Sequence, residues 1–161
     1  MARRKKENFA RKLIGPDPVY GSELVQKLIN VIMERGKKNV ARKIVYESIE
    51  VIVKKMNGDR AKALEYFTRA FGQIVPAVEV RSRRVGGGVY QIPREVPRER
   101  ARALALRWLI EAAAERPGKT MQQRLANELL DAYDGRGAAI KKKTDVHRMA
   151  EANRAFSHYA W

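Results

Sequence analysis

The sequence predicts a mainly α-helical protein, a six-helix, bundle-like body with a protruding two-stranded antiparallel β-ribbon. Apolar residues recur at helical spacing in six segments that are bounded by capping residues, glycine or proline. Only residues 76–94 show the period-two alternation of strands, on either side of a run of three glycines. The chain has 161 residues, which fits one domain with one core, so we expect a single domain over residues 1–161.

Three helices are predicted before the ribbon. Each begins at a side chain that can accept hydrogen bonds from the free N–H groups of a first turn, and these N-cap residues are Ser22, Asn39 and Asp59. Each carries an apolar stripe that we assign to the core, with Val40 as the first stripe residue of the second helix. Each is expected to end at a glycine, and these glycines are Gly36, Gly58 and Gly72.

The ribbon arm, residues 76–94, alternates in side-chain type along its first strand. Glu79, Arg81 and Arg83 share one face, and the run Gly86, Gly87 and Gly88 reverses the chain. A lone two-stranded ribbon is marginal in water, and this one has few apolar residues beyond its base, so another part of the chain must support its tip. Clustered arginines beside Tyr90 suit phosphate binding and base stacking, although charged residues that protect the edges of a solvated hairpin are the alternative.

The fourth helix is predicted to start with Pro97 at its first helical position. Trp108 lies at the centre of its apolar stripe, and we interpret it as a core anchor rather than a base-stacking platform. Arg94, Arg98 and Arg102 recur every four residues, so we expect them on one side of the start of this helix, where they continue the positive surface of the ribbon.

Two more helices complete the prediction. Thr120 caps the fifth helix, and Thr144 caps the sixth, which we place at residues 144–161 with Met149 on its inward face. A flexible basic loop, residues 135–143, is expected between them. Three lysines before a helix N-terminus oppose the positive end of the helix dipole, so this loop is a candidate phosphate site, with a solvated loop as the alternative.

The net charge of +16 is concentrated in four segments. Residues 1–12 and 35–43 each carry a net charge of +5, and residues 76–102 and 135–148 each carry +4, so the rest of the chain is near neutral. Such a distribution is typical of a protein that contacts a polyanion at several points, because each neutralised phosphate adds affinity that does not depend on sequence.

The cations of these segments are the candidate contact residues. The basic N-terminal extension, residues 1–19, has too few apolar residues to fold alone, and a solubilising terminus is its alternative role. The cations between the first two helices also complement the C-terminal end of the first helix dipole. The full candidate set is Arg3, Arg4, Lys5, Lys6, Arg35, Lys37, Lys38, Arg81, Arg83, Arg84, Arg94, Arg98, Arg102, Lys141, Lys142 and Lys143.

The sequence offers no basis for catalysis. It has no cysteine, which excludes disulfides and thiolate chemistry, and it has no phosphate-loop or dinucleotide-binding motif. On a continuous helix His147 and His158 would lie about three turns apart, too far to share one metal ion. No apolar run is long enough for a membrane span. We expect a soluble intracellular protein without enzymatic activity, metal, cofactor or small-molecule substrate.

Several strings, in order along nearly the whole chain, closely resemble one known family. They are Gly36-Lys37-Lys38-Asn39, Val80-Arg81-Ser82-Arg83-Arg84-Val85-Gly86-Gly87 with Tyr90-Gln91, Ala105-Leu106-Arg107-Trp108-Leu109, Lys141-Lys142-Lys143, and Met149-Ala150-Glu151-Ala152-Asn153-Arg154-Ala155-Phe156. Together they resemble the bacterial form of small-subunit ribosomal protein seven. Composition alone indicates only that a polyanion is bound; the ribosome is implied by the likeness.

The resemblance implies a cytoplasmic, ribosomal RNA-binding protein. Its implied partner is the 3′ major domain of small-subunit ribosomal RNA, where binding nucleates assembly of the subunit head. It further implies contacts with small-subunit ribosomal proteins nine and eleven. The ribbon tip would face exit-site transfer RNA and messenger RNA, through Arg83, Arg84, Gly86, Gly87, Gly88 and Tyr90. The implied ribosomal RNA surface is Arg3, Arg4, Lys37, Lys38, Arg81, Arg83, Arg94, Arg98 and Lys141 to Lys143.

A DNA-bending architectural protein is the nearest alternative. Such proteins also join helices to basic ribbon arms, but their arms usually carry an apolar wedge at the tip. Here the tip is Gly86-Gly87-Gly88, so we prefer folded RNA, recognised through shape and phosphates.

Overall fold

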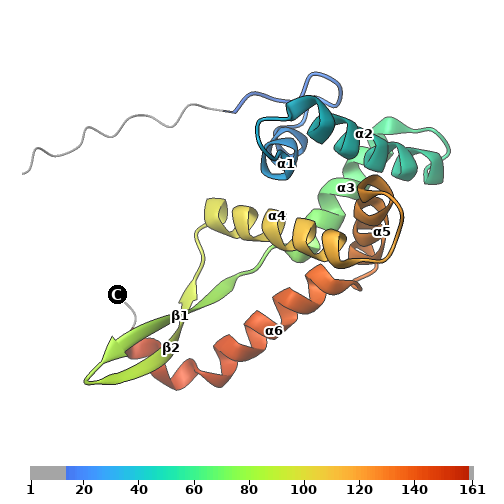
Figure 1. Ribbon diagram of the computed structural model, residues 1–161. Coiled ribbons are helices and arrows are strands. Elements are labelled where there is room, and N and C mark those ends of the chain that lie inside the picture. The colour runs from blue at the N-terminus through green and yellow to red at the C-terminus, as the bar shows by residue number, and fades with distance from the viewer. Residues whose placement is uncertain (1–13, 160–161) are drawn as a thin grey trace, which may run out of the picture.

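The computed structural model describes residues 14–159, in which a body of helices carries a two-stranded ribbon that projects away from it (Figure 1). The strands are β1 (Val78–Val85) and β2 (Gly88–Glu95). The helices are α1 (Glu23–Ile32), α2 (Lys38–Lys55), α3 (Arg60–Ile74), α4 (Arg98–Glu115), α5 (Met121–Tyr133), α6 (Ala138–Ala152) and the 3₁₀-helix η1 (Arg154–Tyr159). The predicted fold class is confirmed.

One hydrophobic core joins α1 to α5, and α6 contributes Ala139 to its edge. The largest completely buried apolar side chains come from α1, α2, α3, α4 and α5, and include Leu28, Ile49, Phe67, Leu109 and Leu125. Burying an apolar side chain of this size stabilises a fold by about 1.5–3 kcal/mol. Trp108 belongs to the same cluster with 9% of its surface exposed, which confirms its predicted role as a core anchor.

Three of the predicted N-caps are confirmed by hydrogen bonds to the first turn. The side chains of Ser22, Asp59 and Thr120 accept from backbone N–H groups three residues further on. The cap predicted at Asn39 is wrong, because α2 begins at Lys38. A consequence is that Val40 lies in the first turn with 55% of its surface exposed, instead of pointing into the core.

The ends of α1 and α3, predicted at glycines, and the start of α4 also differ from prediction. α1 ends at Ile32, before Gly36, because Met33 is already extended. α3 continues through Gly72 to Ile74, which is completely buried, so packing of the last turn outweighs the low helix propensity of glycine. Pro97 is the N-cap of α4 and not its first helical residue.

The largest difference concerns the start of α6. The helix begins at Ala138, so residues 138–143 are helical and not part of a loop. The reason is tertiary: the buried carboxylate of Glu128, on α5, accepts a hydrogen bond from the backbone N–H of Ala139 at 2.9 Å. Thr144 does not cap the helix, since its hydroxyl donates to the Ile140 carbonyl one turn earlier. On this helix Met149 is 50% exposed, so its predicted inward position is wrong.

The ribbon pairs β1 with β2 from Val78 opposite Glu95 to Val85 opposite Gly88. Gly86 and Gly87, with φ of +56° and +87°, make the two-residue reversal that only glycine adopts readily at both positions. Gly88 belongs to β2 and is not a turn residue. A Cβ atom at Gly88 would lie 3.1 Å from the ring of Tyr90, so this glycine gives the aromatic ring its space.

The ribbon tip is supported by the C-terminal segment, as its small apolar content required. The ring of Tyr90 packs against those of Phe156 and Tyr159, with centroids 5.2 and 5.7 Å away. Arg83 Nη1 donates to the Tyr159 carbonyl at 2.5 Å. The predicted continuous helix over residues 144–161 is therefore wrong: α6 ends at Ala152, and the aromatic rings of the following η1 pack against the ribbon.

The segment before α1 is attached to α2 by a buried aspartate. Asp17 is 1% exposed, and its Oδ1 accepts from the Tyr46 hydroxyl at 2.6 Å. Its Oδ2 accepts from the backbone N–H groups of Val19 and Tyr20, each at 3.0 Å. Burial and the hydrogen bond to Asp17 raise the pKa of Tyr46 to about 12. Burial and Glu50 raise the pKa of Tyr20 to about 12 as well.

Because the pKa values of Tyr20 and Tyr46 are raised on folding, we expect the protein to lose stability in alkali. A tyrosine whose pKa rises from 10.0 to about 12 on folding stabilises the fold fully below pH 10, and this contribution is lost as the pH rises towards 12. We expect the free energy of unfolding, measured with urea at a series of pH values, to fall across this range. Tyr46→Phe should show a smaller fall, with Tyr20 left to titrate. An equal fall in both proteins would contradict a contribution from the Tyr46 bond.

Candidate nucleic-acid interface

The turn between α1 and α2 presents Arg35, Lys37 and Lys38 to solvent. Arg35 and Gly36 both have positive φ, of +50° and +73°, which turns the chain sharply before α2. Lys37 is the N-cap of α2 but makes no side-chain capping bond, and the first turn contains no acidic residue. Lysines at this position oppose the positive end of the helix dipole, and an anion placed between them would remove the conflict.

The three lysines of α6 have two different roles. Lys141 and Lys142 are exposed, whereas Lys143 is half-buried and donates from Nζ to the Gln73 carbonyl at 2.7 Å, next to the end of α3. Burial lowers the pKa of Lys143. The phosphate site predicted in front of the sixth helix is wrong in its geometry, because Glu128 already occupies the first turn of α6. The unfavourable pairing of lysines with a helix N-terminus occurs at α2 instead.

The ribbon arginines are divided between its two faces. The carboxylate of Glu79, 7% exposed, binds Arg100 Nε at 2.8 and 3.0 Å and Arg81 Nε at 3.0 Å. Glu79, Arg81 and Arg83 share a face as predicted, but this face also carries Tyr90, which packs against η1. Arg84 lies on the opposite face and is the only exposed arginine of β1, where Arg81 and Arg83 are half-buried.

Arg94, Arg98 and Arg102 do not form one row. Arg94 lies on β2, in a depression that it shares with His147 and Glu151 of α6. Arg98 and Arg102 line a separate groove between α1, α3 and α4.

His147 has a structural role at the base of the ribbon. Its Nε2 accepts from the Ala77 backbone N–H at 3.2 Å, which requires a neutral ring. Burial, and then the charge of Lys143, lower the pKa of His147 and favour that neutral form. His158 lies in η1, where its ring is tilted against that of Tyr159, so the two histidines do not share one helix.

Sequence reasoning missed Lys27, which lines the same groove as Arg98 and Arg102. It lies on α1, whose sequence we interpreted only as a core helix. Within residues 14–159 none of these three cations has a hydrogen-bond or ion-pair partner. Only the packing of α1 beside α4 brings Lys27 to the other two.

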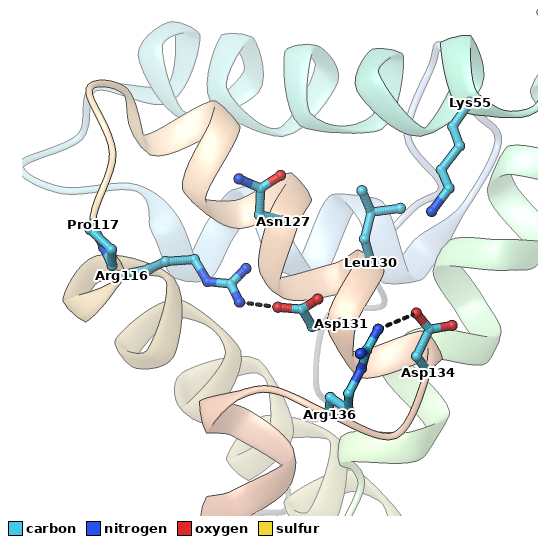
Figure 2. Close-up of a pocket in the computed structure, with 8 residues that line it drawn as sticks. All are labelled: Lys55, Arg116, Pro117, Asn127, Leu130, Asp131, Asp134 and Arg136. Atoms are coloured by element: carbon cyan, nitrogen blue, oxygen red, sulfur yellow. Dashed lines mark hydrogen bonds and ion pairs between the residues drawn. The ribbon is translucent and has the colours of Figure 1, made fainter.

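A second groove provides a contrast, because its arginines are paired (Figure 2). Figure 2 shows Arg116 directed at Asp131 and Arg136 at Asp134, and the second pair is 3.0 Å long. Arg116 also lies 3.4 Å from the buried Glu128. The arginines here are neutralised by carboxylates of α5 and its C-cap, so this groove has little excess charge for a phosphate.

Neither a metal-holding cluster of side chains nor a membrane-spanning helix is found in the described part of the chain. Across residues 14–159 no three His, Cys, Asp or Glu side chains gather as a metal ion would need. The described helices also include none with both the length and the hydropathy of a membrane span. Arg3, Arg4, Lys5 and Lys6 of the predicted interface lie outside the described residues.

A helical body with exposed cations on several surfaces and a glycine-tipped basic ribbon defines the class of structural nucleic-acid-binding proteins. The comparison with known families identifies which one. Residues 3–154 match the sequence model of the ribosomal protein S7p/S5e family, and the chain belongs to this family. This confirms the family inferred from the sequence strings, and with it a ribosomal protein that is not an enzyme.

The relatives cover the chain almost completely. The small ribosomal subunit protein uS7 of Thermotoga neapolitana is 52% identical over 161 residues, which are 100% of both chains. The protein of the same name from Colwellia psychrerythraea is 54% identical over 151 residues, or 94% of each chain. That of Acidiphilium cryptum is 50% identical over 157 residues, covering 98% of this chain and 99% of its own.

Proposed function

We propose that this protein is a structural constituent of the small ribosomal subunit in the cytoplasm, where it acts as one ribosomal RNA-binding domain over residues 1–161. It binds the 3′ major domain of the small-subunit ribosomal RNA directly and nucleates assembly of the head. The observation that carries this proposal is a set of exposed cations at the α1–α2 turn, on α6 and on the ribbon that have no protein partner among residues 14–159, in a chain of this family.

The candidate interface residues form two groups, those that are available to bind RNA and those that already bind protein groups. The exposed cations of the candidate set are assigned to phosphates, and within the described residues these are Arg35, Lys37, Lys38, Arg84, Arg94, Arg98, Lys141 and Lys142. Arg102 is half-buried in its groove and still lacks a protein partner among residues 14–159, so it belongs to the same set. Arg81, Arg83 and Lys143 already bind protein groups, so they act mainly by holding the ribbon and α6 in place. The N-terminal cations Arg3, Arg4, Lys5 and Lys6 lie outside the described residues and are proposed, from the sequence, to contact the same RNA.

The ribbon tip is proposed to lie near exit-site transfer RNA and messenger RNA. Support comes from its geometry, since the arm projects from the body and ends in Gly86 and Gly87 (Figure 1). A tip without side chains approaches a nucleic-acid backbone closely. Arg83, Arg84, Gly88 and Tyr90 complete this surface, and small-subunit ribosomal proteins nine and eleven are the proposed protein neighbours.

Salt dependence tests the phosphate contacts. Lys37→Ala, Lys38→Ala and Arg84→Ala, combined in one protein, should reduce the slope of log K against log salt by about 2–3, because each contact releases counterions. The measurement is binding to a transcribed 3′ major domain fragment at several salt concentrations.

The matched control removes three cations that already have carboxylate partners. Arg60, Arg136 and Arg154 pair with Glu50, Asp134 and Glu151 respectively. Their replacement by alanine changes the net charge equally, and the slope should stay near that of the wild type. An equal reduction of the salt slope in both triple variants would show that only net charge matters. It would contradict the assignment of Lys37, Lys38 and Arg84 to the interface.

Competition between nucleic acids tests the proposal against the DNA-bending alternative. At matched salt, the folded ribosomal RNA fragment should displace duplex DNA of equal length. A preference for the duplex would reverse the proposal.

A further inference from the structure

The groove between α1, α3 and α4 has features that general phosphate attraction does not explain. Lys27, Arg98 and Arg102 line it, and within residues 14–159 none of them has a protein partner. Its walls also include the half-buried apolar side chains of Leu24 and Val75. Three cations beside apolar surface match a ligand with an anionic group and a flat apolar part.

Gly72 provides the second, independent observation. It lies in the last turn of α3 and lines the same groove. Its φ is not positive, and a Cβ atom there would meet nothing within 4 Å. Neither backbone conformation nor packing within the described residues therefore requires glycine, although glycine in a helix costs about 0.5–1 kcal/mol relative to alanine. A ligand that occupies the space next to Gly72 accounts for it.

We infer that this groove binds a single unstacked nucleotide of RNA, with its phosphate held by Lys27, Arg98 and Arg102 and its base inserted against Leu24 and Val75 beside Gly72. The inference rests on the proposed function, because the nucleotide would belong to the bound ribosomal RNA. Single-stranded and bulged nucleotides are the parts of RNA whose bases can leave the stack and enter such a groove.

The remaining charged residue of the groove fits the same ligand. Glu23, in the first turn of α1, also lines it, and the three cations outnumber this acid. Its carboxylate can accept a hydrogen bond from an exocyclic amino group, which adenine carries. The groove of Figure 2 lacks this combination, because its arginines are bound to aspartates.

The test is a titration of the isotope-labelled full chain, followed by backbone NMR, with adenosine 5′-monophosphate and with inorganic phosphate. We expect the nucleotide to bind about ten-fold more tightly than phosphate, which is the usual gain from burying one base. The amides that shift should include those of Gly72, Leu24 and Val75. Equal affinity of the two probes, or shifts elsewhere only, would overturn the inference.

Substitutions of Gly72 distinguish the contribution of the base to affinity from that of the phosphate. Gly72→Leu places a side chain in the space proposed for the base, leaves all three cations in place and suits a helix. It should bring nucleotide affinity down to that of inorganic phosphate, whereas Gly72→Ala, the matched control, should retain most of the difference. Unchanged nucleotide binding by Gly72→Leu would overturn the inference. Arg102→Gln should weaken the binding of both probes. If it does not, Arg102 does not hold the phosphate and the inference is overturned.

Parallel binding to the 3′ major domain fragment distinguishes this inference from the proposed function. If the wild-type protein binds the fragment but shows no selectivity for the nucleotide in the groove, only the groove inference fails. If the fragment itself is not bound, the proposed function fails. With both correct, Gly72→Leu should weaken fragment binding by about ten-fold, the contribution of one base, at an unchanged salt slope.

Discussion

Trp108→Ala should lower the free energy of unfolding by about 3 kcal/mol or more, because it removes a large ring from a closely packed core. Trp108 is 9% exposed and lies in the cluster that joins α1 to α5. The truncated side chain leaves a cavity that the surrounding helices fill only in part. Urea unfolding followed by far-ultraviolet circular dichroism measures the loss.

Two variants on α4 serve as controls for Trp108. Arg107→Ala, at an exposed neighbouring position, should change stability by less than about 0.5 kcal/mol. Trp108→Phe keeps part of the ring and should lie between Arg107→Ala and Trp108→Ala. A Trp108→Ala protein that unfolds like the wild type but binds RNA poorly would contradict the core assignment and favour a base-stacking role.

Glu128→Ala is expected to destabilise the protein by about 3 kcal/mol, the typical cost of removing one partner from a buried ion pair. Glu128 is 1% exposed; its Oε1 accepts from the Ala139 N–H at 2.9 Å, and its Oε2 lies 3.4 Å from Arg116 Nε. The substitution leaves the first turn of α6 without its cap. Hydrogen exchange of α6 amides should increase first near Ala139.

The conservative variant Glu128→Gln distinguishes the contribution of the helix cap to stability from that of the ion pair. Glutamine retains a carbonyl oxygen for the Ala139 N–H but not the ion pair with Arg116, so its loss of stability should be smaller than that of alanine. A loss below about 1 kcal/mol in Glu128→Ala would contradict a buried ion pair that determines the start of α6. Since Lys141 and Lys142 lie on this helix, Glu128→Ala should also weaken binding of the ribosomal RNA fragment.

The sequence correctly predicted those features that are determined by interactions between residues close in the chain. Ser22, Asp59 and Thr120 cap their helices because each hydroxyl or carboxylate reaches an N–H group three residues away. The ribbon and its glycine turn follow from period-two alternation and from the two positive φ angles at Gly86 and Gly87. In these cases the deciding partner lies within a few residues.

The start of α6 and the division of the cations were not predictable in this way. The cap of α6 comes from Glu128, on another helix. Arg83 is directed to the carbonyl of Tyr159, 76 residues away. Charge counting treats Arg83 and Arg84 as equal, yet one binds protein and the other is exposed.

The sequence by itself determined the helical class, the ribbon, the concentration of positive charge and, through its long matching strings, the family. Tertiary structure alone decided which cations remain free for a polyanion and that Lys27 joins Arg98 and Arg102 in one groove. The physical reason is that helical periodicity and total charge depend on residues close in the chain, whereas ion pairing and burial depend on which distant side chains the packed core brings together.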